Sequence, residues 1–166
     1  LANQNVPIIY TTPVSAELIK YASNCFLATK ITFINEMSDL CEKTGADIKE
    51  VSRAIGLDHR IGTAFLNPGP GYGGSCFPKD TRALAETARA AGAPLDIVDT
   101  VIRVNENRKM VAAKKILKHL GNPEGKKIAF LGITFKADTD DIRESASLTI
   151  IPYLQARGII IAAYDP

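Results

Sequence analysis

The feature that most constrains this chain is a change in its hydrophobic pattern near residue 121. Over residues 13–121, apolar side chains recur at the three- and four-residue spacing of helices that each bury one face. After the polar turn "NPEGKK", the chain reads as an apolar run "KIAFLGITF", an amphipathic stretch "ESASLTIIPYLQARG" and a second apolar run "IIIAAYDP". We therefore predict a mainly α-helical domain over residues 13–121, followed over residues 122–166 by the first βαβ unit of an α/β domain.

Capping residues mark the expected helices of the first domain. Thr12 and Pro13 are typical of a helix start and Gly45 of a helix end, which predicts one long helix of roughly 30 residues. The other helices are expected to begin after Asp47, at Pro78 and at "PLDIVD", and the last two to end at Gly92 and Gly121.

Both ends of the chain read as parts of larger units. The β-branched run "VPIIYTT" at residues 6–12 predicts a short strand that has no local partner, and two strands alone do not make a stable sheet. We expect residues 1–12 to be the end of a preceding domain, and residues 122–166 to be the start of a domain that continues.

Composition favours a globular protein with small-molecule partners. Hydrophobic residues make up 46% and charged residues 23%, and the net charge is only +2, with no basic stripe suited to nucleic acid or to a membrane surface. No apolar run is long enough to span a membrane, and the first residues do not resemble a signal peptide, so a cytoplasmic protein is expected. Three scattered cysteines and two histidines favour neither a disulfide framework nor a metal site.

The segment "GPGYGGSCFPKD" at residues 69–80 is the strongest candidate for a site. Its glycines let a ligand approach the backbone closely, and Cys76 stands just before an expected helix start, where free amides and the helix dipole favour a thiolate or an oxyanion. Lys79 favours the thiolate as well. Asp80, one helical turn after Cys76, could orient or deprotonate a water molecule, although an aspartate is also common at a helix start.

Lys20 and Asn24 form a second polar pair. They lie one turn apart in the mostly apolar stretch "AELIKYASNCFLA", where polar groups need partners, and a developing negative charge on a substrate is one candidate. A lysine reaching solvent and an asparagine bonded to a neighbouring helix would explain the same pattern. The run "GPGYGG" follows an irregular segment instead of a strand, so the chain is not expected to contain the strand–turn–helix unit that binds a pyrophosphate through G-x-G-x-x-G.

Three segments, "AELIKYASNCFLATKITFINE", "RIGTAFLNPGPGYGGSCFPKD" and "FLGITFKADTDDIRES", together resemble the UDP-glucose 6-dehydrogenase family of nucleotide-sugar dehydrogenases. The resemblance implies that the second domain is Rossmann-like and that an NAD-binding domain precedes residue 13. It also implies that Cys76 is a nucleophile on an aldehyde derived from UDP-glucose. Lys20 and Asn24 then stabilise the oxyanion or hold the water, and Asp80 helps to activate that water.

The same resemblance assigns binding residues. NAD contacts are expected at Lys79 and Arg143, and a homodimer through the long central helix is expected to bring Arg60 into the neighbouring subunit's site. Without the resemblance, Arg60 and Arg143 would read as ordinary surface arginines. Besides Lys20 and Arg60, the expected substrate contacts are Phe65, Leu66, Asn67, Pro68, Gly69, Gly73 and Lys136.

Two alternatives stay open at this stage. GDP-mannose 6-dehydrogenase shares the mechanism and much of the cysteine loop, and a non-catalytic helical dimerisation module would explain the long apolar helices equally well. The family's catalytic glutamate from the first domain has no counterpart here, so these 166 residues alone are expected to be inactive.

Overall fold

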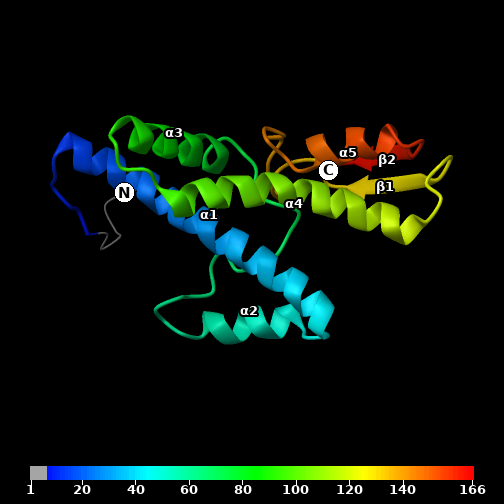
Figure 1. The fold of residues 1–166 in the computed structure, drawn as a ribbon, viewed down its shortest axis with the longest axis horizontal. Helices are drawn as coiled ribbons and strands as arrows, with labels where there is room; N and C mark the ends of the chain where they lie inside the picture. Colours follow the sequence, from blue (N-terminus) through cyan, green and yellow to red (C-terminus); the bar gives the residue numbers. More distant parts are fainter. Residues whose placement is uncertain (1–6) are drawn as a thin grey trace.

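The computed structural model describes residues 7–166 and contains five helices and two strands in that range. The elements are α1 (Pro13–Thr44), α2 (Ile48–Gly56), α3 (Phe77–Ala90), α4 (Asp96–Leu120), β1 (Lys127–Leu131), α5 (Ser147–Gln155) and β2 (Ile160–Tyr164). The predicted class, helices followed by a βαβ unit, is confirmed (Figure 1).

The helix boundaries follow the caps in the sequence. The Thr12 hydroxyl accepts a hydrogen bond from the Ser15 amide at 3.2 Å, and Asp47 accepts one from the Lys49 amide at 2.7 Å. Gly45 takes the left-handed conformation that ends α1, with φ of 79°. None of the described helices is both long and apolar enough to cross a bilayer.

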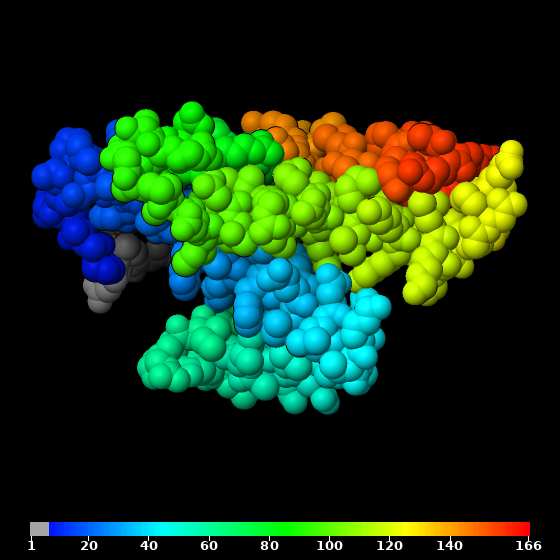
Figure 2. Space-filling model, viewed as in Figure 1, coloured from blue at the N-terminus to red at the C-terminus, as the bar shows by residue number. Residues whose placement is uncertain are grey.

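Helices α1, α3 and α4 pack together, and α2 contacts only the far part of α1 (Figure 1). In the space-filling view, α2 and the loop after it project from the main body (Figure 2). Cys25 of α1, Leu84 of α3 and Val98 of α4 form part of the buried cluster that joins the three helices.

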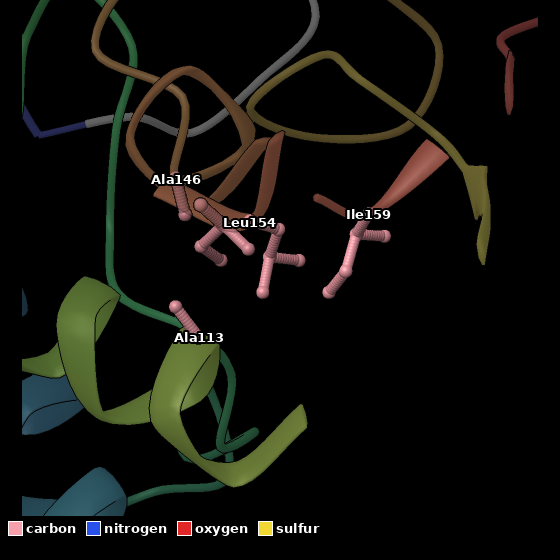
Figure 3. Packing of buried hydrophobic residues seen from close by; sticks show 5 residues of the cluster. Ala113, Ala146, Leu154 and Ile159 are labelled. Carbon is pink, nitrogen blue, oxygen red and sulfur yellow. The ribbon is translucent and has the colours of Figure 1, made fainter. Parts of the chain in front are cut away.

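The βαβ unit packs on the second half of α4. Ala113 of α4 faces Ala146, Leu154 and Ile159 across a buried apolar cluster (Figure 3). Strands β1 and β2 are parallel, with Lys127 opposite Ile160. This contact between helix and βαβ unit brings the loops after β1 close to the glycine-rich segment.

The strand predicted for residues 6–12 is wrong for the described residues 7–12, which have no regular structure, whereas residue 6 lies outside the described range. Ile8, Ile9 and Tyr10 are all at least three-quarters exposed. A strand needs a partner for its backbone hydrogen bonds, and no described strand lies beside this segment.

Candidate active site

Cys76 is the N-cap residue of α3, as its position before Phe77 and Pro78 suggested. Its thiol is exposed, and its carbonyl accepts the first helical hydrogen bond from the Asp80 amide at 2.8 Å. Proline suits this position because the first amides of a helix have no partner within the helix. The thiol therefore stands at the positive end of a 14-residue helix, in reach of solvent and of a ligand.

Two clefts meet at Cys76. The first, which we call the Cys76–Lys136 cleft, has a volume of about 730 Å³ and lies between α1, the glycine-rich segment and the loop after β1. The second, the Cys76–Arg143 cleft, has a volume of about 1010 Å³ and lies between the start of α3, α4 and residues 143–149. Ser75 and Cys76 line both clefts, so one thiol can face two different ligands.

Most of the substrate residues expected from the sequence line the Cys76–Lys136 cleft. They come from segments far apart in the chain, and the Lys136 ammonium lies 5.3 Å from the centre of the Phe135 ring. The predicted residues that line it are Lys20, Asn24, Phe65, Asn67, Gly69, Gly73, Cys76 and Lys136.

Three other predicted substrate residues lie elsewhere. Leu66 is buried with only 2% of its surface exposed, and Pro68 is not among the lining residues of the cleft. Arg60 is exposed on the loop after α2, where it forms an ion pair with Asp58 that raises the pKa of the arginine. Within one copy of the chain, Arg60 contributes to neither cleft.

Lys20, Asn24 and Asp80 form one hydrogen-bonded chain. The Lys20 ammonium donates to Asn24 Oδ1 at 3.4 Å, and Asn24 Nδ2 donates to Asp80 Oδ2 at 2.5 Å. Asp80 is 4% exposed and does not line the cleft, because Asn24 stands between them. Asp80 therefore does not face the cleft directly, and its carboxylate reaches the cleft through the Asn24 amide.

Charged side chains surround the Cys76–Arg143 cleft, including the predicted cofactor residues. Lys79 and Arg143 have side chains that are 72% and 68% exposed, and each pairs with a neighbouring aspartate. A hydrogen bond from Arg143 is the main cause that lowers the pKa of Asp141 to about 2. Two exposed cations beside the thiol fit an anionic ligand.

Sequence reasoning missed an ionic network behind this cleft. Arg82 of α3 donates to Glu144 at 2.8 Å and lowers the pKa of that carboxyl. Lys109 of α4, whose side chain is only 3% exposed, pairs with Glu106 at 3.1 Å and with Glu144 at 3.7 Å. The three-residue spacing of Glu106 and Lys109 on one helix face was the one signal available in the sequence.

Gly73 and Gly74 explain how the cysteine loop fits against the βαβ unit. A Cβ atom on Gly73 would lie 2.4 Å from the Glu144 carbonyl oxygen, and one on Gly74 would lie 2.7 Å from the Phe135 ring. The Gly74 amide donates to the Arg143 carbonyl at 2.7 Å. Side chains at residues 73 and 74 would push the cysteine loop away from the βαβ unit, so the close approach of these two segments requires glycine.

No cluster of potential metal ligands occurs in the described part of the chain.

Comparison with known proteins gives matches over nearly the whole chain. Residues 14–107 match the central domain of the UDP-glucose/GDP-mannose dehydrogenase family, and residues 129–166 match the UDP binding domain of that family. The chain is 53% identical over 161 residues to a UDP-glucose 6-dehydrogenase of Rhizobium meliloti (strain 1021), covering 96% of this chain and 37% of that relative. The chain thus spans little more than a third of the length of the relative it matches.

Solved structures of sugar-nucleotide dehydrogenases are similar to this fold, and two of them are compared in turn. A UDP-glucose dehydrogenase from the hyperthermophilic archaeon Pyrobaculum islandicum superposes with a TM-score of 0.93 at 41% identity, covering 98% of this chain and 38% of that one. A GDP-mannose dehydrogenase from Pseudomonas aeruginosa superposes with a TM-score of 0.58 at 35% identity, covering 97% and 36%. On the match of both family models and on these identities, the chain belongs to the UDP-glucose/GDP-mannose dehydrogenase family.

Proposed function

We propose that this chain supplies the nucleophile and much of the substrate site of an NAD-dependent UDP-glucose 6-dehydrogenase, which oxidises UDP-glucose to UDP-glucuronate. The observation that carries the proposal is the exposed thiol of Cys76 at the junction of two clefts. One thiol placed between two ligand sites suits a reaction in which a sugar carbon must face both sulfur and a hydride acceptor.

The chemistry assigned to Cys76 takes four electrons from one carbon. Loss of a hydride and a proton converts the primary alcohol of the sugar to an aldehyde, and the thiolate then adds to the aldehyde carbon to give a thiohemiacetal. Loss of a second hydride gives a thioester, and water displaces the thiolate to release the carboxylate. Each NAD molecule, when bound, would accept one hydride, so two NAD molecules are used for each sugar oxidised.

Lys20 is assigned the stabilisation of the oxyanion that forms on the same carbon. Its ammonium faces the Cys76–Lys136 cleft and is oriented by Asn24 Oδ1. Asn24 is in turn oriented by Asp80, which uses one N–H of the amide. Asp80 therefore acts as a positioning residue for Asn24 and for a water that Asn24 holds during thioester hydrolysis.

The Cys76–Lys136 cleft is assigned to the nucleotide sugar and the Cys76–Arg143 cleft to the cofactor. Asn67, Gly69, Gly73 and Lys136 line the first cleft, and apolar walls such as the Phe65 ring suit a sugar or a base. Lys79 and Arg143 in the second are exposed cations that suit the anionic phosphates of NAD.

UDP-glucose is proposed ahead of GDP-mannose as the substrate. The match of residues 129–166 is to a UDP binding domain, and the fold superposes more closely on the UDP-glucose enzyme than on the GDP-mannose enzyme. We also propose a cytoplasmic enzyme, because its three cysteines are unpaired and the cytoplasm keeps thiols reduced.

We propose that the enzyme is a homodimer joined along α1. Four large apolar side chains recur at seven-residue intervals on this helix and are each about half exposed or more, although each would normally be covered. They are Ile19, Phe26, Phe33 and Leu40. A partner on this stripe could receive Arg60, which has no role in the clefts of its own copy.

The experiment that tests the proposal uses the full-length protein with Cys76→Ser. Mixed with UDP-glucose and NAD, this variant should retain a stable sugar ester on residue 76, visible by mass spectrometry after digestion, because an ester is a poorer acyl donor than a thioester. Cys41→Ser, at a buried cysteine remote from both clefts, should turn over normally. Normal turnover by Cys76→Ser without an adduct would remove the basis of the proposal. If the wild-type enzyme oxidises GDP-mannose as fast as UDP-glucose, the choice of substrate is overturned.

A further inference from the structure

We infer that three side chains outside the clefts, Asn105 and Arg108 on α4 and Asn35 on α1, are positioning residues that fix the glycine-rich loop of residues 69–74 for substrate. The inference rests on the proposed function, since it concerns how the Cys76–Lys136 cleft holds a nucleotide sugar. Its basis is a set of hydrogen bonds from these side chains to the backbone of the loop.

Asn105 binds both backbone polar groups of one loop residue. Its Oδ1 accepts from the Tyr72 amide at 2.8 Å, and its Nδ2 donates to the Tyr72 carbonyl at 3.1 Å. Asn105 is 2% exposed and Tyr72 is 6% exposed, so water does not compete for these groups. A carboxamide carries an acceptor and a donor side by side. It can therefore satisfy the backbone N–H and C=O groups that a neighbouring strand would satisfy in a sheet.

Gly69, at the other end of the loop, is held in the same way by two side chains. The Gly69 amide donates to Asn35 Oδ1 at 2.7 Å, and the Gly69 carbonyl accepts from Arg108 Nε at 3.0 Å. Asn35 is also 2% exposed. The Arg108 guanidinium is itself anchored by Asp39 of α1 at 2.5 Å. Although burial opposes it, a hydrogen bond from Lys115 and the positive charge of Arg108 lower the pKa of Asp39, which keeps this anchor charged.

The glycines beside these anchors leave the loop little free space. A Cβ atom on Gly71 would lie 3.0 Å from Asn105 Oδ1, and one on Gly73 would lie 2.4 Å from the Glu144 carbonyl oxygen. The loop is therefore confined between α4 on one side and the βαβ unit on the other. The hydrogen bonds fix its position along α4, and the absence of side chains lets it approach both walls.

This arrangement matters because the fixed residues line the cleft. Gly69, Tyr72 and Gly73 form part of the wall that leads to Cys76. Misplacing a binding wall by about 1 Å can lower an enzymatic rate up to about 100-fold. The three side chains would thus determine where the sugar lies relative to the thiol without touching either.

The test compares Asn105→Leu with Asn107→Ala in the full-length protein. Asn107 is exposed on the same helix and serves as the matched control. We expect Asn105→Leu to raise the KM for UDP-glucose about tenfold or more, while the KM for NAD stays unchanged, because the cofactor residues lie in the other cleft. A merely structural role for Asn105 would reduce the amount of folded enzyme and leave both KM values unchanged. That result would overturn the inference.

Two further measurements keep the inference testable on its own. If Asn105→Leu does not fold, Arg108→Lys removes the donor to Gly69 while keeping a cation beside Asp39, and it should raise the same KM selectively. Amide exchange in peptides that cover residues 69–76 should increase in either variant relative to Asn107→Ala, and unchanged exchange would contradict the inference. This readout needs no turnover, so a wild-type protein that is inactive on UDP-glucose would refute the proposed function while the loop anchors could still be tested.

Discussion

The Asn24 amide donates to the Asp80 carboxylate at 2.5 Å and so joins α1 to the first turn of α3, whose N-cap residue is Cys76. Both residues are nearly fully buried, at 6% and 4% exposed. The negative charge of Asp80 also reaches Cys25, whose thiol pKa is raised by burial first and by Asp80 second. Asp80 is thus a buried carboxylate that contacts the site only through Asn24. One of its oxygens accepts from the Asn24 amide, and the other pairs with the exposed Lys79 ammonium at 3.1 Å.

Asp80→Asn should lower kcat for UDP-glucose oxidation about 100-fold or more and change the KM values little. The variant keeps the shape but removes the charged acceptor that orients the Asn24 amide, so the reacting water is held less well. Steady-state NADH formation measures the effect. Glu86→Gln, which neutralises an exposed carboxylate on the same helix, is the control and should behave as wild type. A kcat equal to that of wild type in Asp80→Asn would exclude the positioning role.

Gly73→Ala should destabilise the protein by about 2 kcal/mol and reduce activity, whereas Gly69→Ala should leave its stability unchanged. The new methyl at residue 73 would meet the Glu144 backbone at 2.4 Å, and neither backbone segment can move without disturbing a cleft wall. At residue 69 nothing lies within 4 Å of the new atom. Urea unfolding of the two variants measures the difference. Equal free energies of unfolding would mean that the loop and the βαβ unit do not approach as closely as described.

Native protein treated with iodoacetamide near neutral pH should be labelled at Cys76 alone. Cys25 and Cys41 are 5% and 7% exposed, and burial together with Asp80 raises the pKa of the Cys25 thiol, whereas Cys76 is exposed at a helix N-terminus. Peptide mass spectrometry against reaction time gives the three rates. UDP-glucose should protect Cys76 from labelling. Comparable labelling of all three cysteines would show that the thiol has no special setting.

The elements predicted well from the sequence are those set by local chemistry. Thr12, Asp47 and Gly45 cap helices through contacts within a few residues, so the sequence alone predicts the boundaries. The order strand, helix, strand also predicted that the two strands pair in parallel, because a crossover helix returns the chain in the same direction. Strand β1 ends at Leu131, and the Asp165 carboxylate accepts hydrogen bonds from the amides of Ile133 and Thr134 where the chain turns away from the strand.

The parts that could not be predicted depend on distant residues. Residues 7–12 have the composition of a strand, but a strand forms only where a partner supplies its hydrogen bonds. Asn35 and Asn105 contact the glycine-rich loop from residues more than thirty positions away, and no local pattern marks a buried asparagine as a loop anchor. The sequence correctly predicted that Asp80 lies in the first turn of α3. The direction in which its carboxylate points depends on the position of α1, which supplies its partner Asn24.

Phe33→Asp should dissociate the proposed dimer. The side chain is 48% exposed near the middle of the apolar stripe on α1, and a charge there would be buried without a partner in any interface that covers the stripe. Sedimentation of the full-length protein should change from dimer to monomer. Leu57→Asp, at a residue that is 78% exposed outside the stripe, is the control. A wild-type protein that sediments as a monomer would refute the dimer, and a Phe33→Asp variant that stays dimeric would place the interface elsewhere.

Tyr72→Phe should make the protein less sensitive to alkaline pH. Burial raises the pKa of Tyr72 from 10.0 to about 12. Because the pKa in the folded state is the higher one, the stability linked to this group is fully present below pH 10 and is lost as the pH rises towards 12. A shift of this size corresponds to about 2 to 3 kcal/mol. Urea unfolding at pH 9 and pH 11.5 should therefore show a smaller loss of stability in Tyr72→Phe than in wild type. Tyr10→Phe, at a tyrosine that is 91% exposed, should lose as much as wild type. An equal loss in all three proteins would mean that the Tyr72 hydroxyl ionises as freely in the folded protein as in the unfolded chain.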